Sequence, residues 1–207
     1  MTILAFVLSA VFAYFVSGLN PAIIMSKAIY KKDIRNEGSG NPGFTNFKRV
    51  FGNKYAWYVF ALDILKGVII SVFAGLLFSA AGFDWSLGAA YAGMFAMLGH
   101  AFPVYYGFKG GKGFLVALST AFFVDWRAGV VAFVVMAVLL LTLKYMSLAT
   151  NAGLLCAVFT AAFAGVSFAA CLMYALCVFF VIARHHENID RLINGTESKF
   201  SFHSKKD

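Results

Sequence analysis

The sequence contains few charged residues and few cysteines. Asp, Glu, Lys and Arg together make up 13% of the 207 residues, whereas hydrophobic residues make up 61%. A soluble domain cannot bury so much apolar surface, so the composition excludes that class and predicts a polytopic membrane protein. The cysteines Cys156, Cys171 and Cys177 lie inside apolar runs and form no CxxC pair. Neither a disulfide framework nor a cysteine metal site is therefore expected.

Acidic residues are scarcer than basic ones, with nine Asp and Glu against 17 Lys and Arg and a formal net charge of +8. In a soluble protein this excess would suggest nucleic-acid binding. Here the basic residues cluster in the segments between apolar runs. That is the positive-inside pattern of membrane proteins, so we expect no nucleic-acid partner.

The apolar runs predict an all-α fold with seven transmembrane helices in a single domain, residues 1–207. The predicted spans are residues 3–24, 57–81, 86–103, 114–125 and 128–143, a sixth ending near Gly165 and a seventh ending near Ala183. The fourth and fifth are shorter than the roughly 20 residues that cross a bilayer, so they are expected to be buried in protein or extended by flanking residues. The first run lacks a basic n-region and is interpreted as a retained helix rather than a signal peptide.

The positions of the basic residues predict the orientation of these spans. On this topology 15 of the 17 Lys and Arg fall on one side of the membrane. The positive-inside rule therefore places the N-terminus outside and the C-terminus in the cytoplasm. Within the second span, Asp63 and Lys66 are three residues apart and are predicted to pair on one helix face, either to lower their burial cost or to serve the site.

The segment GFKGGKGF, residues 107–114, lies between two apolar runs. Glycines free the backbone N–H groups to surround an anion, and Lys109 and Lys112 add positive charge, so the segment predicts a phosphate-binding loop. It is not a Walker A loop, because Tyr106 and Gly113 occupy positions where that motif requires Gly and Ser or Thr. The alternative is a cytoplasmic turn whose lysines only set topology and contact anionic lipid.

The predicted topology brings four polar segments to the cytoplasmic face: residues 38–49, 99–113, 147–150 and 184–197. They offer cations and neutral donors suited to phosphate, namely Arg49, Lys112, Arg191, Ser39, Thr45, Thr150 and Asn188. His185 and Asn188 are three residues apart and should face the same way. Arg191 and Glu197 are expected to pair, and His100 to cap its helix or orient the loop. No G-x-S-x-G elbow supports a serine hydrolase, and no H-E-x-x-H pattern supports zinc on His100, His185 and His186.

Three long segments are similar to the signature motifs of a known family. GSGNPGFTNFKR, GHAFPVYYGFKGGKGF and RHHENIDRLINGTE, supported by DILKG and YMSLAT, resemble the bacterial acyl-phosphate:glycerol-3-phosphate acyltransferase family of the PlsY type. The resemblance implies a multi-pass inner-membrane enzyme whose active site faces the cytoplasm. Such an enzyme transfers a fatty acyl group from acyl phosphate to the 1-hydroxyl of sn-glycerol-3-phosphate, the first step of phospholipid biosynthesis. It implies lysophosphatidic acid and phosphate as products, no cofactor and no metal, and contact with membrane lipid; we expect a monomer.

The resemblance also implies site residues. It assigns catalytic positions to Lys112, His185, Asn188 and Arg49, and substrate or phosphate contacts to Ser39, Asn41, Thr45, Gly110, Gly111, Gly113, Ser147 and Thr150. This chain departs from the family pattern at Phe44, Phe114, Lys144 and Thr150. Acyl phosphate carries a good leaving group, so no covalent nucleophile is required, and either His185 or a substrate phosphate takes the hydroxyl proton. The competing hypotheses are a membrane carrier for an anionic phosphorylated metabolite, which breaks no bond, and a scaffold subunit.

Overall fold

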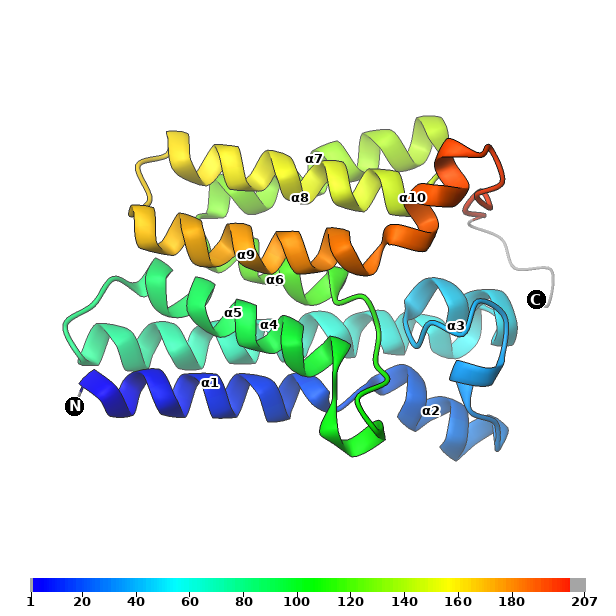
Figure 1. Ribbon diagram of the computed structural model, residues 1–207, viewed down its shortest axis with the longest axis horizontal. Helices are drawn as coiled ribbons and strands as arrows, with labels where there is room; N and C mark the ends of the chain where they lie inside the picture. The colour runs from blue at the N-terminus through cyan, green and yellow to red at the C-terminus, as the bar shows by residue number, and fades with distance from the viewer. Residues whose placement is uncertain (1, 202–207) are drawn as a thin grey trace.

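The computed structural model describes residues 2–201, and all of the regular structure in this part is helical (Figure 1). The all-α prediction is therefore confirmed, while the last basic residues of the predicted tail, 202–207, lie outside the described part. The helices are α1 Thr2–Gly18, α2 Pro21–Tyr30, η1 Ile34–Asn36, α3 Phe44–Phe51, α4 Asn53–Ala80, α5 Trp85–Ala101, η2 Val104–Tyr106, α6 Phe114–Val124, α7 Trp126–Leu143, α8 Met146–Phe163, α9 Phe168–Arg184 and α10 His186–Ile193.

The long helices lie side by side along the long axis of the molecule (Figure 1). Helices α1, α4 and α5 pack against one another, and α7 packs against α8. Helix α9 contacts α5, α6 and α8, so it joins these two groups. The short helices α2, α3 and α10 gather at one end of the bundle, together with the loop that joins α5 to α6. That end carries the polar segments of the sequence.

Five helical stretches are long and apolar enough to cross a membrane in the described part of the chain: Thr2–Tyr30, Asn53–Ala80, Trp85–Tyr106, Trp126–Leu143 and Met146–Phe163. Helices α9 and α10 would make a sixth if their 58° bend lies within one span. Helix α6, at 11 residues, is too short to span alone. Every residue from Leu115 to Ala121 is buried, so α6 is enclosed by other helices, as its length predicted.

The first predicted span is interrupted. Helix α1 ends at Gly18, and α2 begins at Pro21 after the cap residue Asn20. The Asn20 side-chain oxygen accepts a hydrogen bond from the Ile23 amide at 3.0 Å. Proline suits the first position of a helix because its missing N–H would have no partner there. This capping signal restarts the helix, so the first predicted span contains a break, while α1 and α2 together still form one apolar stretch, Thr2–Tyr30, that is long enough to cross a membrane.

Small residues let the helices approach closely, as is common between membrane helices. At Gly99 on α5, an added Cβ would lie 2.9 Å from the Cα of Tyr14 on α1 and 2.8 Å from its carbonyl carbon. Both are backbone atoms, so they cannot move aside as a side-chain tip would. The contact between α1 and α5 therefore requires glycine at this position.

We predict that Gly99→Ala destabilises the fold by roughly 1–3 kcal/mol, because the added methyl group forces two helix backbones apart. The measurement is thermal unfolding of the detergent-purified protein. Gly18→Ala is the matched control, since its Cβ would meet the ring of Tyr105 at 3.3 Å, and that ring is 49% exposed and able to shift. Equal melting temperatures for the two variants would contradict the prediction.

Candidate functional site

A cavity of about 530 Å³ lies where the residues of α3, α8 and α10 meet at the polar end of the bundle. Three cationic side chains from separate segments line it: Arg49, Lys112 and Arg191. The predicted site residues on its wall are Ser39, Asn41, Thr45, Arg49, Lys112, Ser147, His185 and Asn188. Residues separated by up to 149 positions in sequence thus share one cavity, and its chemistry suits a phosphorylated ligand.

A smaller cavity of about 70 Å³ adjoins the first and shares Asn41, Thr45, Lys112 and His185 with it. Its wall includes two more predicted residues, Thr150 and Gly113, and also Asp63 and His100 from the apolar helices. The Thr150 hydroxyl donates to the Ser147 carbonyl at 3.1 Å. Its proton is therefore held within α8, and its oxygen is left to accept.

Two of the predicted phosphate contacts are placed differently. The Gly110 and Gly111 amides donate to the carbonyls of Ala101 and His100, each at 3.0 Å, instead of pointing into a cavity. Gly110 lines another cavity, of about 700 Å³, on the side of Lys109 and Arg184. The prediction that these two amides surround a phosphate is wrong for this structure, because the end of α5 already uses both donors. Their role is to let the loop pack closely on α5.

The loop nevertheless delivers Lys112 to the site. Gly113 has a φ of 73°, a left-handed conformation that glycine adopts readily, and it forms the N-cap of α6 directly after Lys112. The Lys112 ammonium donates to the side-chain oxygen of Asn188 on α10. Burial lowers the pKa of Lys112 from its ordinary value, although Glu187 opposes this shift. A cation with so little water around it gains strongly from an anionic ligand.

His185 lies between α9 and α10, one residue beyond the end of α9, and is 7% exposed. Its Nδ1 lies 2.7 Å from the carbonyl oxygen of Val181. A carbonyl oxygen only accepts, so Nδ1 carries the proton. Burial lowers the pKa of His185 to about 4. The ring is therefore neutral near pH 7, and Nε2 is an acceptor at the cavity wall.

Asn46 on α3 shapes the part of the first loop that carries Ser39. It is 2% exposed, its side-chain oxygen accepts from the Ser39 amide at 2.9 Å, and its side-chain nitrogen donates to the Glu37 carbonyl at 2.9 Å. Sequence reasoning did not single it out. It does lie three residues before Arg49 in the polar segment, so helical spacing was a usable signal.

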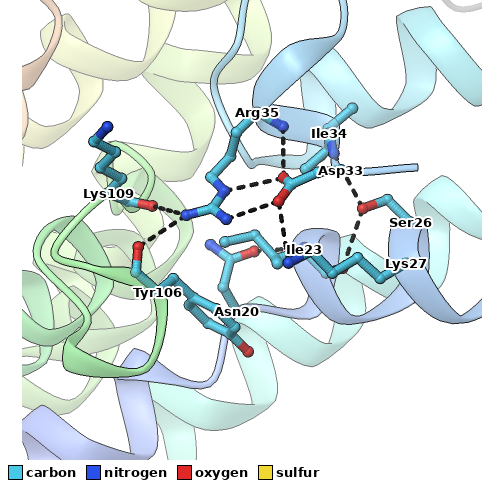
Figure 2. A network of polar contacts seen from close by, with 9 residues as sticks. All are labelled: Asn20, Ile23, Ser26, Lys27, Asp33, Ile34, Arg35, Tyr106 and Lys109. Atoms are coloured by element: carbon cyan, nitrogen blue, oxygen red, sulfur yellow. Dashed lines mark hydrogen bonds and ion pairs between the residues drawn. The ribbon is translucent and has the colours of Figure 1, made fainter. Parts of the chain in front are cut away.

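Arg35 joins the first loop to the glycine-rich loop (Figure 2). Its guanidinium contacts the Asp33 carboxylate at 2.9 and 2.7 Å and donates to the carbonyl of Tyr106 at 2.8 Å. The hydrogen bonds from Arg35 hold the pKa of Asp33 well below its usual range. Neither residue was predicted to act at the site, because a contact across 71 positions leaves no local pattern.

Residues 194–201, after α10, run along the main cavity. Glu197 accepts from Ser147 at 2.9 Å, from Asn188 at 2.6 Å and from Arg191 at 2.7 Å. The predicted pairing of Arg191 with Glu197 is therefore confirmed. Arg49 donates to the Ser198 hydroxyl at 3.0 Å. This terminal segment thus neutralises part of the positive charge that the cavity collects.

The ion pair predicted between Asp63 and Lys66 is confirmed, at 2.7 Å. His100 also holds the loop as expected, through its backbone carbonyl. Within residues 2–201, no three His, Cys, Asp or Glu side chains lie close enough together to hold a metal ion. A zinc site on His100, His185 and His186 therefore has no geometric support.

Comparison with known proteins gives one consistent result. A family model described as glycerol-3-phosphate acyltransferase matches residues 7–195. Proteins of that name from Thermoanaerobacter pseudethanolicus and Aquifex aeolicus are each 37% identical to this chain, over 93% and 92% of it and over 94% and 96% of their own lengths.

Two solved structures of PlsY, an integral membrane glycerol 3-phosphate acyltransferase, are similar to this fold. The glycerol 3-phosphate form has a TM-score of 0.87 at 35% identity and covers 95% of this chain and 96% of its own. The lysophosphatidic acid form has a TM-score of 0.82 at 34% identity and covers 95% of each chain. The likeness extends over nearly the whole fold.

The contacts of Glu197 predict a pH-dependent stability. Burial raises its pKa, but the hydrogen bonds from Asn188, Arg191 and Ser147 outweigh that effect and leave the pKa below the ordinary 4.5. A carboxyl group with a lowered pKa stabilises the fold above its unfolded-state pKa, and this stabilisation is lost as the pH falls through the folded-state pKa. We therefore expect Glu197→Gln to lower the melting temperature at neutral pH, with the difference from wild type shrinking between about pH 5 and pH 3.

Glu187→Gln is the control for this measurement. Glu187 lies 4.0 Å from Arg191, but its side chain is 62% exposed, so its charge should contribute little to stability. Thermal unfolding of both variants across the pH range is the measurement. A melting difference for Glu197→Gln that stays constant with pH would show that its charge does not matter.

Proposed function

The chain belongs to the glycerol-3-phosphate acyltransferase family, and on this premise we propose that it transfers a fatty acyl group from acyl phosphate to the 1-hydroxyl of sn-glycerol-3-phosphate. The products are lysophosphatidic acid and inorganic phosphate, and the reaction begins phospholipid synthesis. The observation that carries this proposal is the cavity in which Lys112, Arg49 and Arg191 meet the hydroxyl and amide groups of the first loop and α10. Two phosphorylated substrates require that collection of charge.

In this mechanism the protein positions the substrates and stabilises charge. Acyl phosphate is a mixed anhydride whose phosphate leaves readily, so the site needs no covalent nucleophile. Lys112 and Arg49 neutralise phosphate oxygens, with Thr45 donating beside them. Asn188, which already contacts Lys112, holds glycerol-3-phosphate together with His185. The Gly110 and Gly111 amides take no part, because α5 binds them.

His185 is the proton acceptor in this proposal, since its Nε2 is free to accept at the cavity wall. The glycerol hydroxyl oxygen forms a bond to the acyl carbon while its proton passes to Nε2. The bond from the acyl carbon to the phosphate oxygen then breaks, and the electron pair leaves with the phosphate. The proton on Nε2 is returned to the departing phosphate or to water, which restores the neutral ring.

The membrane arrangement is also part of the proposal. The protein is an integral membrane protein with several apolar helices. We infer seven spans in the bacterial inner membrane, with the short α6 as the fourth, the N-terminus outside and the C-terminus inside. The basic residues support this orientation, because they concentrate at the end of the bundle that holds the cavity. The active site then faces the cytoplasm, and one copy of the chain contains every residue used in the mechanism.

The first test is phosphate release by detergent-purified protein supplied with palmitoyl phosphate and glycerol-3-phosphate. We expect release that needs both substrates and falls by at least about 10²-fold in Lys112→Ala, because one charge-stabilising donor is lost. Lys109→Ala is the matched control, since Lys109 lies in the same loop but lines a different cavity. Protein that binds glycerol-3-phosphate yet releases no phosphate would favour the carrier hypothesis.

The second test concerns the proton. His185→Asn keeps a group able to reach the Val181 carbonyl but removes the Nε2 acceptor, so kcat should fall by about 10²-fold or more. His186→Asn serves as the control, because His186 is exposed and absent from both cavities. Near-normal turnover by His185→Asn would transfer the role of base to a substrate phosphate.

A further inference from the structure

A buried polar chain lies beneath the smaller cavity. Asp63 and Lys66 come from α4 and His100 from α5, and these residues are 3%, 7% and 3% exposed. The three residues lie in apolar parts of these helices, and ionisable groups at such positions are costly unless they are paired and used. Lys112 and His185 line the same cavity as Asp63 and His100. This row of three polar side chains therefore extends from the interior of the helix bundle to the wall of the smaller cavity.

Lys66 links the members of this chain. Its ammonium lies 2.7 Å from the Asp63 carboxylate, donates to the Ser17 carbonyl at 3.0 Å and lies 2.9 Å from Nδ1 of His100. The Asp63 contact is close but not well directed for a hydrogen bond, so it is an ion pair. The Ser17 carbonyl accepts a hydrogen bond and the Asp63 carboxylate carries negative charge, so both contacts fit a charged ammonium on Lys66. The ammonium also donates to the Leu19 carbonyl at 3.4 Å, so every partner of Lys66 other than His100 is an oxygen.

The contact with Lys66 determines the tautomer of His100. An ammonium has no lone pair, so Nδ1 of His100 must accept and the single ring proton lies on Nε2. This tautomer is the reverse of His185, where Nδ1 carries the proton. The wall of the smaller cavity thus combines one imidazole donor with one imidazole acceptor, and Lys112 lies on the same wall.

The donor edge of His100 faces the glycine-rich loop. A Cβ placed on Gly111 would overlap His100 Nε2, and one placed on Gly113 would lie 3.7 Å from His100 Cδ2. Within residues 2–201, Nε2 has no hydrogen-bond partner. His100 lines the smaller cavity, so an N–H group there without a protein acceptor is available to an acceptor supplied by a ligand. Glycine at position 111 therefore allows the loop to lie directly against this edge of the ring.

We propose that His100 is a further substrate-contacting residue, whose Nε2–H donates to a phosphate oxygen of the substrate in the smaller cavity. Lys66 is its positioning residue, because it fixes the tautomer that places the proton on Nε2. Asp63 holds Lys66 in place and balances its charge. The proposal rests on the acyltransferase function, since it assigns the donor to that reaction's phosphorylated substrates.

Two substitutions at His100 distinguish loss of the Nε2–H donor from loss of the packing of the side chain. The Gln side chain can place an N–H group near the position of Nε2, whereas the Asn side chain reaches only the position of Nδ1 and can still accept from Lys66. We expect His100→Asn to lower kcat/KM by about 10²-fold and His100→Gln to lower it by about tenfold or less. Thermal unfolding verifies that both variants are folded. Equal losses in the two folded variants, or wild-type kcat/KM in His100→Asn, would overturn the proposal.

A second measurement does not depend on activity. Nitrogen-15 NMR of histidine-labelled wild-type protein reports which ring nitrogen carries the proton, and the signals missing from His100→Gln identify His100. We expect the proton on Nε2 in wild type. The double variant Asp63→Asn with Lys66→Met should populate the other tautomer, and it leaves no lone buried carboxylate. A proton on Nδ1 in wild type would overturn the proposal.

These outcomes are distinguishable from failure of the proposed function. If wild-type protein transfers no acyl group, the acyltransferase assignment fails, whatever the tautomer. If wild-type protein is active and His100→Asn is equally active, only the role of His100 is rejected.

Discussion

The docking of the glycine-rich loop on the end of α5 is the interaction on which the site depends. Two backbone hydrogen bonds, from Gly110 to Ala101 and from Gly111 to His100, fix the loop, and Arg35 holds its other side through the Tyr106 carbonyl. Because the loop is fixed, Lys112 emerges toward α10 instead of toward solvent. Backbone bonds of this kind do not depend on side-chain rotamers, so they place a charged group more reproducibly than a flexible turn would.

A cavity lined by several cations must also be stable when no substrate is bound. Arg49, Lys112 and Arg191 would repel one another across the empty cavity, and burial makes that repulsion stronger than in water. Glu197 offsets part of it by accepting from Ser147, Asn188 and Arg191. The same carboxylate connects α8, α10 and the chain beyond α10. Glu197 therefore contributes both to the charge balance of the cavity and to its shape, and in the proposed mechanism Lys112 and Arg49 remain for substrate.

Hydropathy predicted the long helices well, because a membrane requires an unbroken apolar run: α4, α5 and α7 begin and end close to the predicted positions. The break near Asn20 is a local effect of a side-chain cap, and Asn20 and Pro21 mark it in the sequence although hydropathy alone does not. The site residues came from the resemblance to the family's motifs, and all but Gly110 and Gly111 line the two cavities. The predictions for Gly110 and Gly111 failed because a glycine-rich sequence indicates that backbone N–H groups are accessible but does not indicate which acceptor they bind. Asn46 and Arg35 were missed because their partners are far away in sequence or are backbone atoms.

The two buried histidines show why backbone and lysine partners matter for the chemistry. Acyl transfer to a hydroxyl needs an acceptor for the incoming proton and donors for the negative charge that develops on oxygen. An isolated neutral imidazole exchanges between tautomers and supplies neither role reliably. The Val181 carbonyl selects the acceptor at Nε2 of His185, and the Lys66 ammonium selects the donor at Nε2 of His100. Because a carbonyl only accepts and an ammonium only donates, each selection is enforced by chemistry that substrate binding does not alter. In the proposed mechanism, one residue type thereby fills two opposite roles beside Lys112.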